Sequence, residues 1–185
     1  IINEGEEAGY ATKIVDKLPG TWGEGLRLEN NQATVVSSKQ NIYNVQYETS
    51  TNTIIFTMAE ESPKNVLNPY NAETGILESE TVLVQCKVMG KPDTENSKIL
   101  TNIAYIAEEY NAVTQEIITL ETKQDRDSKT WEYPQENNLI TTDMGYIGNN
   151  QNKSDLSDNN AYYKGLQDDD DFEKVIILPQ SFDLS

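Results

Sequence analysis

The chain has 185 residues, with 14 lysines and arginines against 31 aspartates and glutamates, no histidine and one cysteine. Without histidine it cannot form a Ser-His-Asp or Cys-His nucleophile, or a histidine-ligated zinc site. Its net charge of −17 opposes binding to nucleic acid and to anionic membrane surfaces, because their phosphates repel it. Cations and proteins with basic surfaces remain as the ligand classes that this charge favours.

The length suits one domain with a substantial core. The longest apolar runs, such as Val82 to Met89, are far too short to cross a bilayer, so we expect no membrane insertion in this segment. The opening Ile1-Ile2-Asn3 is typical of the end of a strand, and we expect the chain to be part of a longer polypeptide. We assign residues 1–180 to a single module and 181–185 to a linker or the start of a next repeat.

Apolar, often β-branched residues at every second position predict strands along most of the chain. In chain order, the expected strands are residues 10–16, 33–38, 42–48, 53–58, 81–89, 98–107, 117–121 and 173–178. Turn signals rich in Gly, Pro, Asn and Asp separate them. This pattern indicates an all-β fold, and the expected form is an immunoglobulin-like antiparallel β-sandwich.

The single cysteine, Cys86, alternates with Val84 and Val88. It has no partner for an internal disulfide. We therefore expect it to be a buried core thiol and not a reactive one.

Residues 111–171 differ in composition from the rest of the chain and form a long acidic loop excursion. Residues 108–171 hold 15 acidic and 5 basic side chains, and the stretch is dense in Asn, Asp, Ser and Gly. Composition alone would indicate disorder. Because aromatic residues such as Trp131, Tyr133 and Tyr146 are scattered through it, we expect an ordered excursion that depends on something other than a large apolar core.

Calcium is the cofactor that this excursion predicts. Calcium takes six to eight oxygen ligands, and irregular acidic loops can wrap around it. The spacing does not match an EF-hand loop, and solvated surface charge is the alternative interpretation. The candidate metal ligands are Asp125, Asp127, Asp155, Asp158, Asp168, Asp169 and Asp170.

Asp16 and Asn102 form a candidate buried polar pair. Strand alternation places Asp16 on the same face as Ile14, and Asn102 on the face opposite to Ile103. Buried polar groups need partners, so one interpretation is a structural hydrogen bond. The other is two of the three members of a spontaneous Lys–Asn isopeptide crosslink, whose buried lysine would lie on a strand before residue 1.

Aromatic side chains offer a different kind of site. Trp131, Tyr162 and Tyr163 are candidate contacts for a sugar or a protein partner, with packing in loops or core as the alternative role. Adjacent carboxylates such as Glu60 and Glu61 point to opposite faces of a strand, so they cannot cooperate in catalysis. We expect no enzyme activity.

Several motifs occur in an order that resembles a known group of proteins. They are Ile2-Asn3-Glu4-Gly5, Ala11-Thr12-Lys13-Ile14-Val15-Asp16-Lys17-Leu18-Pro19, Val84-Gln85-Cys86-Lys87-Val88, Leu100-Thr101-Asn102-Ile103-Ala104, Asp125-Arg126-Asp127-Ser128, Gly148-Asn149-Asn150, Asp155-Leu156-Ser157-Asp158, Tyr163-Lys164-Gly165, the run from Asp168 to Val175, and Ser181-Phe182-Asp183-Leu184-Ser185. Together they resemble the repeated extracellular modules of Gram-positive surface proteins, which are similar to the conserved-repeat and isopeptide-forming fimbrial domain families.

The resemblance implies a non-catalytic stalk or spacer module at the cell wall, with neighbouring repeats of the same polypeptide as partners. The alternative is an adhesin module that recognises a host protein or a glycan through aromatic loops. Two departures from the family stand out: the strand that would carry the isopeptide lysine is absent, and Asp127-Ser128 continues into Lys129-Thr130-Trp131. Because an exposed strand edge recruits partners, we expect either a strand-exchanged homodimer or residues 173–184 filling the edge.

Overall fold

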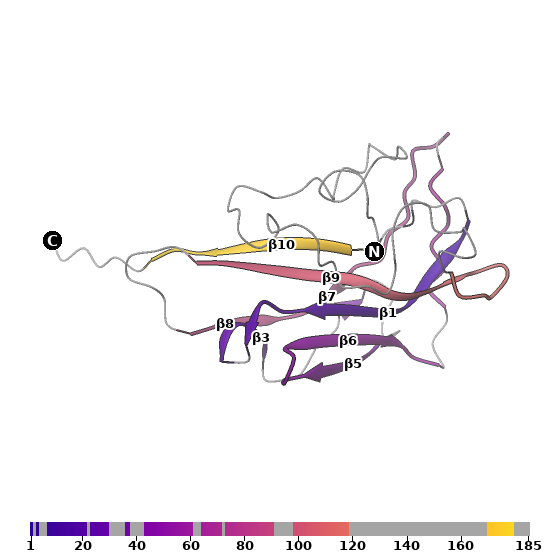
Figure 1. Cartoon of the computed structure of the whole chain (residues 1–185). Coiled ribbons are helices and arrows are strands. Elements are labelled where there is room, and N and C mark those ends of the chain that lie inside the picture. The colour runs from indigo at the N-terminus through magenta and orange to yellow at the C-terminus, as the bar shows by residue number, and fades with distance from the viewer. Residues whose placement is uncertain are drawn as a thin grey trace.

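The computed structural model describes residues 1, 3, 7–21, 23–29, 36–37, 43–60, 64–71, 73–90, 98–118 and 170–179, with the backbone alone at 36–37, 99 and 170–174. Regular structure in these ranges is almost entirely β (Figure 1). The strands are β1 Gly9–Lys17, β2 Gly20–Thr21, β3 Glu24–Leu28, β4 Val36–Ser37, β5 Tyr43–Glu48, β6 Thr53–Met58, β7 Val82–Leu83, β8 Cys86–Met89, β9 Lys98–Asn111 and β10 Asp170–Ile177.

Five strands form the largest sheet, in the order β10-β9-β1-β6-β5, and every neighbouring pair is antiparallel. β1 and β6 pair in an unbroken register in which Ile14 faces Phe56 and Asp16 faces Ile54. The β1–β9 ladder shifts register on both sides of Lys13. The two shifts cancel, so the strands pair in the same register on either side of this local irregularity.

The other strands form a three-stranded sheet, β2-β3-β8, and a two-stranded pair, β4-β7. β2 and β3 meet through Gly20 and Gly25, whose φ angles are 83° and 122°. A Cβ atom on Gly20 would lie 2.1 Å from the backbone oxygen of Glu24, so only glycine fits this close approach.

Both larger sheets contribute to one core. Leu26 and Leu28 of β3 pack in the same cluster as residues of the five-stranded sheet. The buried members are Ala11, Ile14, Leu18, Leu26, Leu28, Tyr43, Ile54, Phe56 and Leu100. The structure therefore confirms an all-β fold built from antiparallel sheets.

Several element boundaries differ from those expected. The strand expected at 81–89 is divided into β7 and β8, while β9 continues past Ala107 to Asn111. The strand expected at 173–178 begins earlier, at Asp170, and it pairs with β9. Of the strands expected at 33–38 and 117–121, only 36–37 and 117–118 lie within the described residues.

Cys86 is half-buried in β8, and packs against the core from its margin. Within the described residues, no helix is long and apolar enough to cross a membrane.

Candidate functional site

Asp16 and Asn102 lie on adjacent strands of the five-stranded sheet. Asp16 faces Ala104 across the β1–β9 ladder, so Asn102, two residues before Ala104, is its diagonal neighbour on the same face. The side chain of Asn102 forms a hydrogen bond with the Asp16 carboxyl group. Because Ile14 of the same face belongs to the core cluster, the pair points into the core. The structure thus brings the two predicted residues together, with Asp16 buried and Asn102 half-buried.

Burial controls the chemistry of Asp16. Its side chain is only 6% exposed, and this loss of hydration raises the pKa of its carboxyl group from 3.8 to about 6, against the opposing effect of the Asn102 hydrogen bond. The Oδ1 atoms of Asp16 and Asn102 are both buried and have no hydrogen-bond partner among the described residues. Protonation of Asp16 would add a second donor to the pair, beside the Asn102 amide, for oxygens that otherwise only accept.

Cys86 lies close enough to Asp16 for the two groups to interact electrostatically. Burial first, and the Asp16 charge second, raise the pKa of the Cys86 thiol to about 11. The thiolate is the reactive form of cysteine, so this environment makes Cys86 a poor nucleophile near neutral pH.

The isopeptide interpretation of this pair requires a buried lysine. Lys13 and Lys17 flank Asp16 in β1, but both are exposed and project from the opposite face of the strand. Among the lysines whose side chains the structure describes, none is buried. The described residues thus include two of the three groups that an isopeptide crosslink needs, the carboxyl and the amide, but no buried lysine.

A second buried carboxyl group belongs to Glu80. The Asn65 Nδ2 donates a hydrogen bond to Glu80 Oε2, and both residues are buried. Burial and the nearby Glu80 hold the pKa of Tyr43 well above its usual value. The Tyr43 hydroxyl donates to the Ala11 backbone oxygen at 3.1 Å, which links this cluster to β1.

Asn52 is a buried polar side chain that joins several segments of the fold. Only 2% exposed, it donates through Nδ2 to the backbone oxygens of Leu18, Gly20 and Leu26 at 3.2, 3.3 and 2.8 Å. Its Oδ1 accepts a hydrogen bond of 2.6 Å from the Tyr47 hydroxyl. The turn between β5 and β6 is thereby joined to the β1–β2–β3 connection.

The roles of Asn52 and Glu80 were not predicted from the sequence. The backbone oxygens that accept from Asn52 lie 26 to 34 residues away in the chain, and Asn65 lies 15 residues from Glu80, so no local pattern indicates these contacts. A different feature, a turn capped by an asparagine side chain, does have a sequence signal: the pattern Asn-Ala-x-Thr occurs at 71–74 and again at 111–114. Asn71 and Asn111 each accept two backbone N–H groups through Oδ1 in matching turns, at 73–74 and at 113–114.

Most of the other predicted site residues lie outside the described residues. These are the candidate metal ligands Asp125, Asp127, Asp155, Asp158, Asp168 and Asp169, and the aromatic residues Trp131, Tyr162 and Tyr163. Asp170 begins β10, where its backbone pairs with Tyr105. Within the described part of the chain, no group of three or more acidic or sulfur ligands is placed to hold a metal ion.

Comparison with known proteins identified no relative. No family model matches the chain, and neither a curated protein nor a solved structure matches it.

Proposed function

We propose that the chain is a non-catalytic structural module of a bacterial cell surface, a spacer in which the facing sheets form an immunoglobulin-like sandwich. The observation that supports this proposal is the arrangement of β1 and β10 on either side of β9. β9 is 14 residues long and lies between them in the sheet. The start of β1 and the end of β10 lie at opposite ends of that strand.

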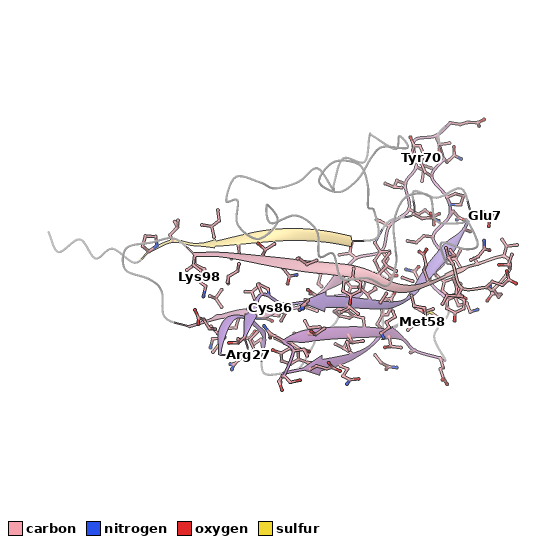
Figure 2. All side chains as sticks on the ribbon, in the orientation of Figure 1. Glu7, Arg27, Met58, Tyr70, Cys86 and Lys98 are labelled. Carbon is pink, nitrogen blue, oxygen red and sulfur yellow. The ribbon has the colours of Figure 1, made fainter. Side chains whose placement is uncertain are left out.

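The pairing of β1 and β10 with β9 defines where these two strand ends lie. Gly9, at the start of β1, pairs with Asn111, while Ile177, at the end of β10, pairs with Lys98. At about 3.3 Å per residue, the two ends of β9 are roughly 43 Å apart. Glu7 and Lys98 lie toward opposite ends of the molecule in Figure 2.

Tension along a longer polypeptide would therefore act parallel to the strands. The hydrogen bonds of an antiparallel ladder are perpendicular to the strands, so such tension loads many of them at once. Force applied across one end of a ladder would instead break the bonds pair by pair. β1 is further held by buried Ala11 and Ile14, and it has a paired neighbour on each side. This geometry suits a module that transmits force between neighbouring repeats outside the cell.

Calcium is part of the proposal, because the acidic stretch between β9 and β10 carries the predicted ligands. Extracellular calcium would offset the repulsion among its carboxylates.

Single-molecule force spectroscopy tests the spacer function. Tandem copies pulled through their termini would load β1 and β10 in shear. For the comparison, Lys98→Cys and Ile177→Cys in a Cys86→Ser background would provide attachment points at a paired position, and pulling there would peel β10 from β9. We expect a clearly higher opening force in the first geometry. Equal forces in the two geometries would contradict the proposal.

A further inference from the structure

Two separate segments pair with the same edge of β9. β1 pairs with Glu109, Tyr110 and Asn111 on one edge. Because that edge is taken, Ile117, which pairs with Tyr110, and Ile118, whose N–H donates to the Glu109 oxygen at 3.1 Å, must lie on the other. That second edge is the one along which β10 pairs with β9, from Tyr105 to Lys98.

The register shows that these two segments belong to one interrupted edge strand. If the chain continued from Ile117 opposite Tyr110 without interruption, Thr122 would lie opposite Tyr105. Asp170 occupies that position instead, although it comes much later in the sequence. Ile118 and Asp170 therefore lie opposite Glu109 and Tyr105, two positions of β9 that are only about 13 Å apart. The chain leaves this edge after Ile118 and rejoins it at Asp170, within this short distance.

We propose that residues 119–169 act as a length reserve, which carries no tension while the β9–β10 ladder is intact and lengthens the module when that ladder opens. The inference rests on the proposed spacer function. With the ladder intact, tension passes from β1 through β9 to β10 by lateral hydrogen bonds. Both ends of 119–169 are attached to β9, so the segment is bypassed. Once β10 separates, tension runs along the chain from Ile177 back to Ile118.

β10 is the strand expected to separate first. Among the described strands it lies at the edge of the sheet, with β9 as its one paired neighbour. Among the β10 side chains that the structure describes, those of residues 175–177, none is buried, and Ile177 is the one that packs against the core. Val175 and Ile176 are 39% and 45% exposed. β1, in contrast, is held from both sides and contributes buried residues.

The expected lengthening follows from the register. Ile118 and Ile177 lie opposite Glu109 and Lys98, which are about 36 Å apart along β9 at the usual rise of a strand. The chain that joins Ile118 to Ile177 directly is far longer, and at up to about 3.6 Å per residue it would span roughly 210 Å when stretched. Separation of β10 should therefore add roughly 170–180 Å of contour length before the core unfolds.

A deletion variant removes the reserve and keeps the register. Deletion of residues 121–168 joins Leu120 to Asp169, and its length equals the offset between the two registers on β9. Thr119, Leu120 and Asp169 then face the three β9 positions between Glu109 and Tyr105. As a control, deletion of 121–167 leaves one residue too many, and a one-residue slip turns side chains to the wrong face or forces a bulge. This control should have a lower thermal unfolding midpoint than the in-register deletion.

The test pulls tandem copies through their termini in excess EDTA, so that calcium cannot hold the segment. For the full chain we expect an early step of about 170–180 Å, followed by unfolding of the core. In the in-register deletion, the opening force should be similar and the early step should disappear. The inference is overturned if the full chain unfolds in one event, or if both proteins show the same early step. Because the spacer function is tested by shear against peeling, strong shear resistance without the early step would reject the reserve alone.

Discussion

The Asp16 carboxyl group and the Asn102 amide form a hydrogen bond across β1 and β9, on the face of the sheet that points into the core. Each side chain retains one buried oxygen atom without a partner among the described residues. An ionised carboxylate in this position has lost hydration that a single amide hydrogen bond only partly replaces. The pair should therefore make the stability of the fold depend on pH.

Acidification should stabilise the protein through Asp16. The pKa of this group is about 6 in the folded state against 3.8 ordinarily, so the folded state binds the proton more tightly than the unfolded state. The stabilisation grows as pH falls from above 6 toward 3.8, and the buried charge costs up to roughly 3 kcal/mol at pH 7.5. Asp16→Asn removes the titration. It should be more stable than the parent at pH 7.5.

Urea unfolding of the parent and of Asp16→Asn at pH 7.5 and pH 4 checks this prediction. Many other carboxyl groups titrate in both proteins, so the informative quantity is the difference in free energy of unfolding between them. The advantage of the variant should shrink at pH 4. A difference that stays constant between the two pH values would show that Asp16 does not titrate as proposed.

Asn52 should be among the most costly polar residues to replace. Its φ angle is 56°, a conformation that glycine adopts without strain, so Asn52→Gly removes the side chain and leaves the backbone unstrained. The variant would leave the buried backbone oxygens of Leu18 and Leu26 without their Asn52 donor. We expect a loss of about 2–4 kcal/mol in the free energy of unfolding.

The control for Asn52 is its exposed neighbour Thr51, whose hydroxyl contacts Glu48 in the same turn. Thr51→Ala should change stability by less than about 0.5 kcal/mol, as is usual for exposed positions. Similar losses in the two variants, measured by urea unfolding, would argue that the turn itself matters and that the Asn52 side chain does not.

Strong local alternation made part of the fold predictable. The run Thr53 to Met58 is rich in β-branched residues and forms β6 with the expected bounds. β3 was missed because Gly23 and Gly25 surround Glu24 in a pattern typical of a turn. Its pairing depends on Gly25 meeting Gly20, and local sequence does not show such a contact. Adjacent Glu108 and Glu109 likewise hid the end of β9, because two neighbouring charged residues interrupt the alternation that predicts a strand.

The candidate site also has a part that the sequence predicts and a part that depends on how the strands come together. Parity along a strand indicates which face Asp16 and Asn102 occupy, so residue order alone carries that information. The backbone partners of Asn52 come from a connection 26 to 34 residues away, and they become its neighbours only when two sheets meet. The interruption of the edge strand also depends on register, which is a property of paired strands. Sequence composition showed that residues 111–171 are unusual, but it did not indicate that the chain leaves and rejoins the same edge of β9 on either side of this stretch.

The turn at Gly75 offers a clean measurement of backbone strain. Gly75 has a φ of 67°, and a Cβ atom placed there would meet no other atom within 4 Å. Gly75→Ala therefore introduces strain without a clash, and it should cost about 1–2 kcal/mol. Gly23 is the matched control, since it also has open space around a Cβ atom but no positive φ. Thermal unfolding should show a lower midpoint for Gly75→Ala than for Gly23→Ala, and equal midpoints would contradict this explanation.

Calcium should stabilise the protein through the stretch between β9 and β10. A ligand at about 100 times its dissociation constant adds roughly 2.7 kcal/mol to the folded state, which raises the unfolding midpoint of a domain of this size by several degrees. The measurement is thermal unfolding in excess EDTA and then in millimolar calcium, at constant ionic strength. Magnesium at the same concentration controls for general charge screening, because it demands a smaller and more regular ligand shell.

The deletion of residues 121–168 locates the calcium effect. It removes Asp125, Asp127, Asp155, Asp158 and Asp168, while Asp169 and Asp170 remain. If the predicted ligands bind calcium together, the full chain should respond and the deletion variant should not. An equal response in both proteins would place the site among the residues they share, and no response in either would mean that the acidic stretch is solvated charge. The two proteins share the described sheets, so their difference isolates the contribution of the deleted residues.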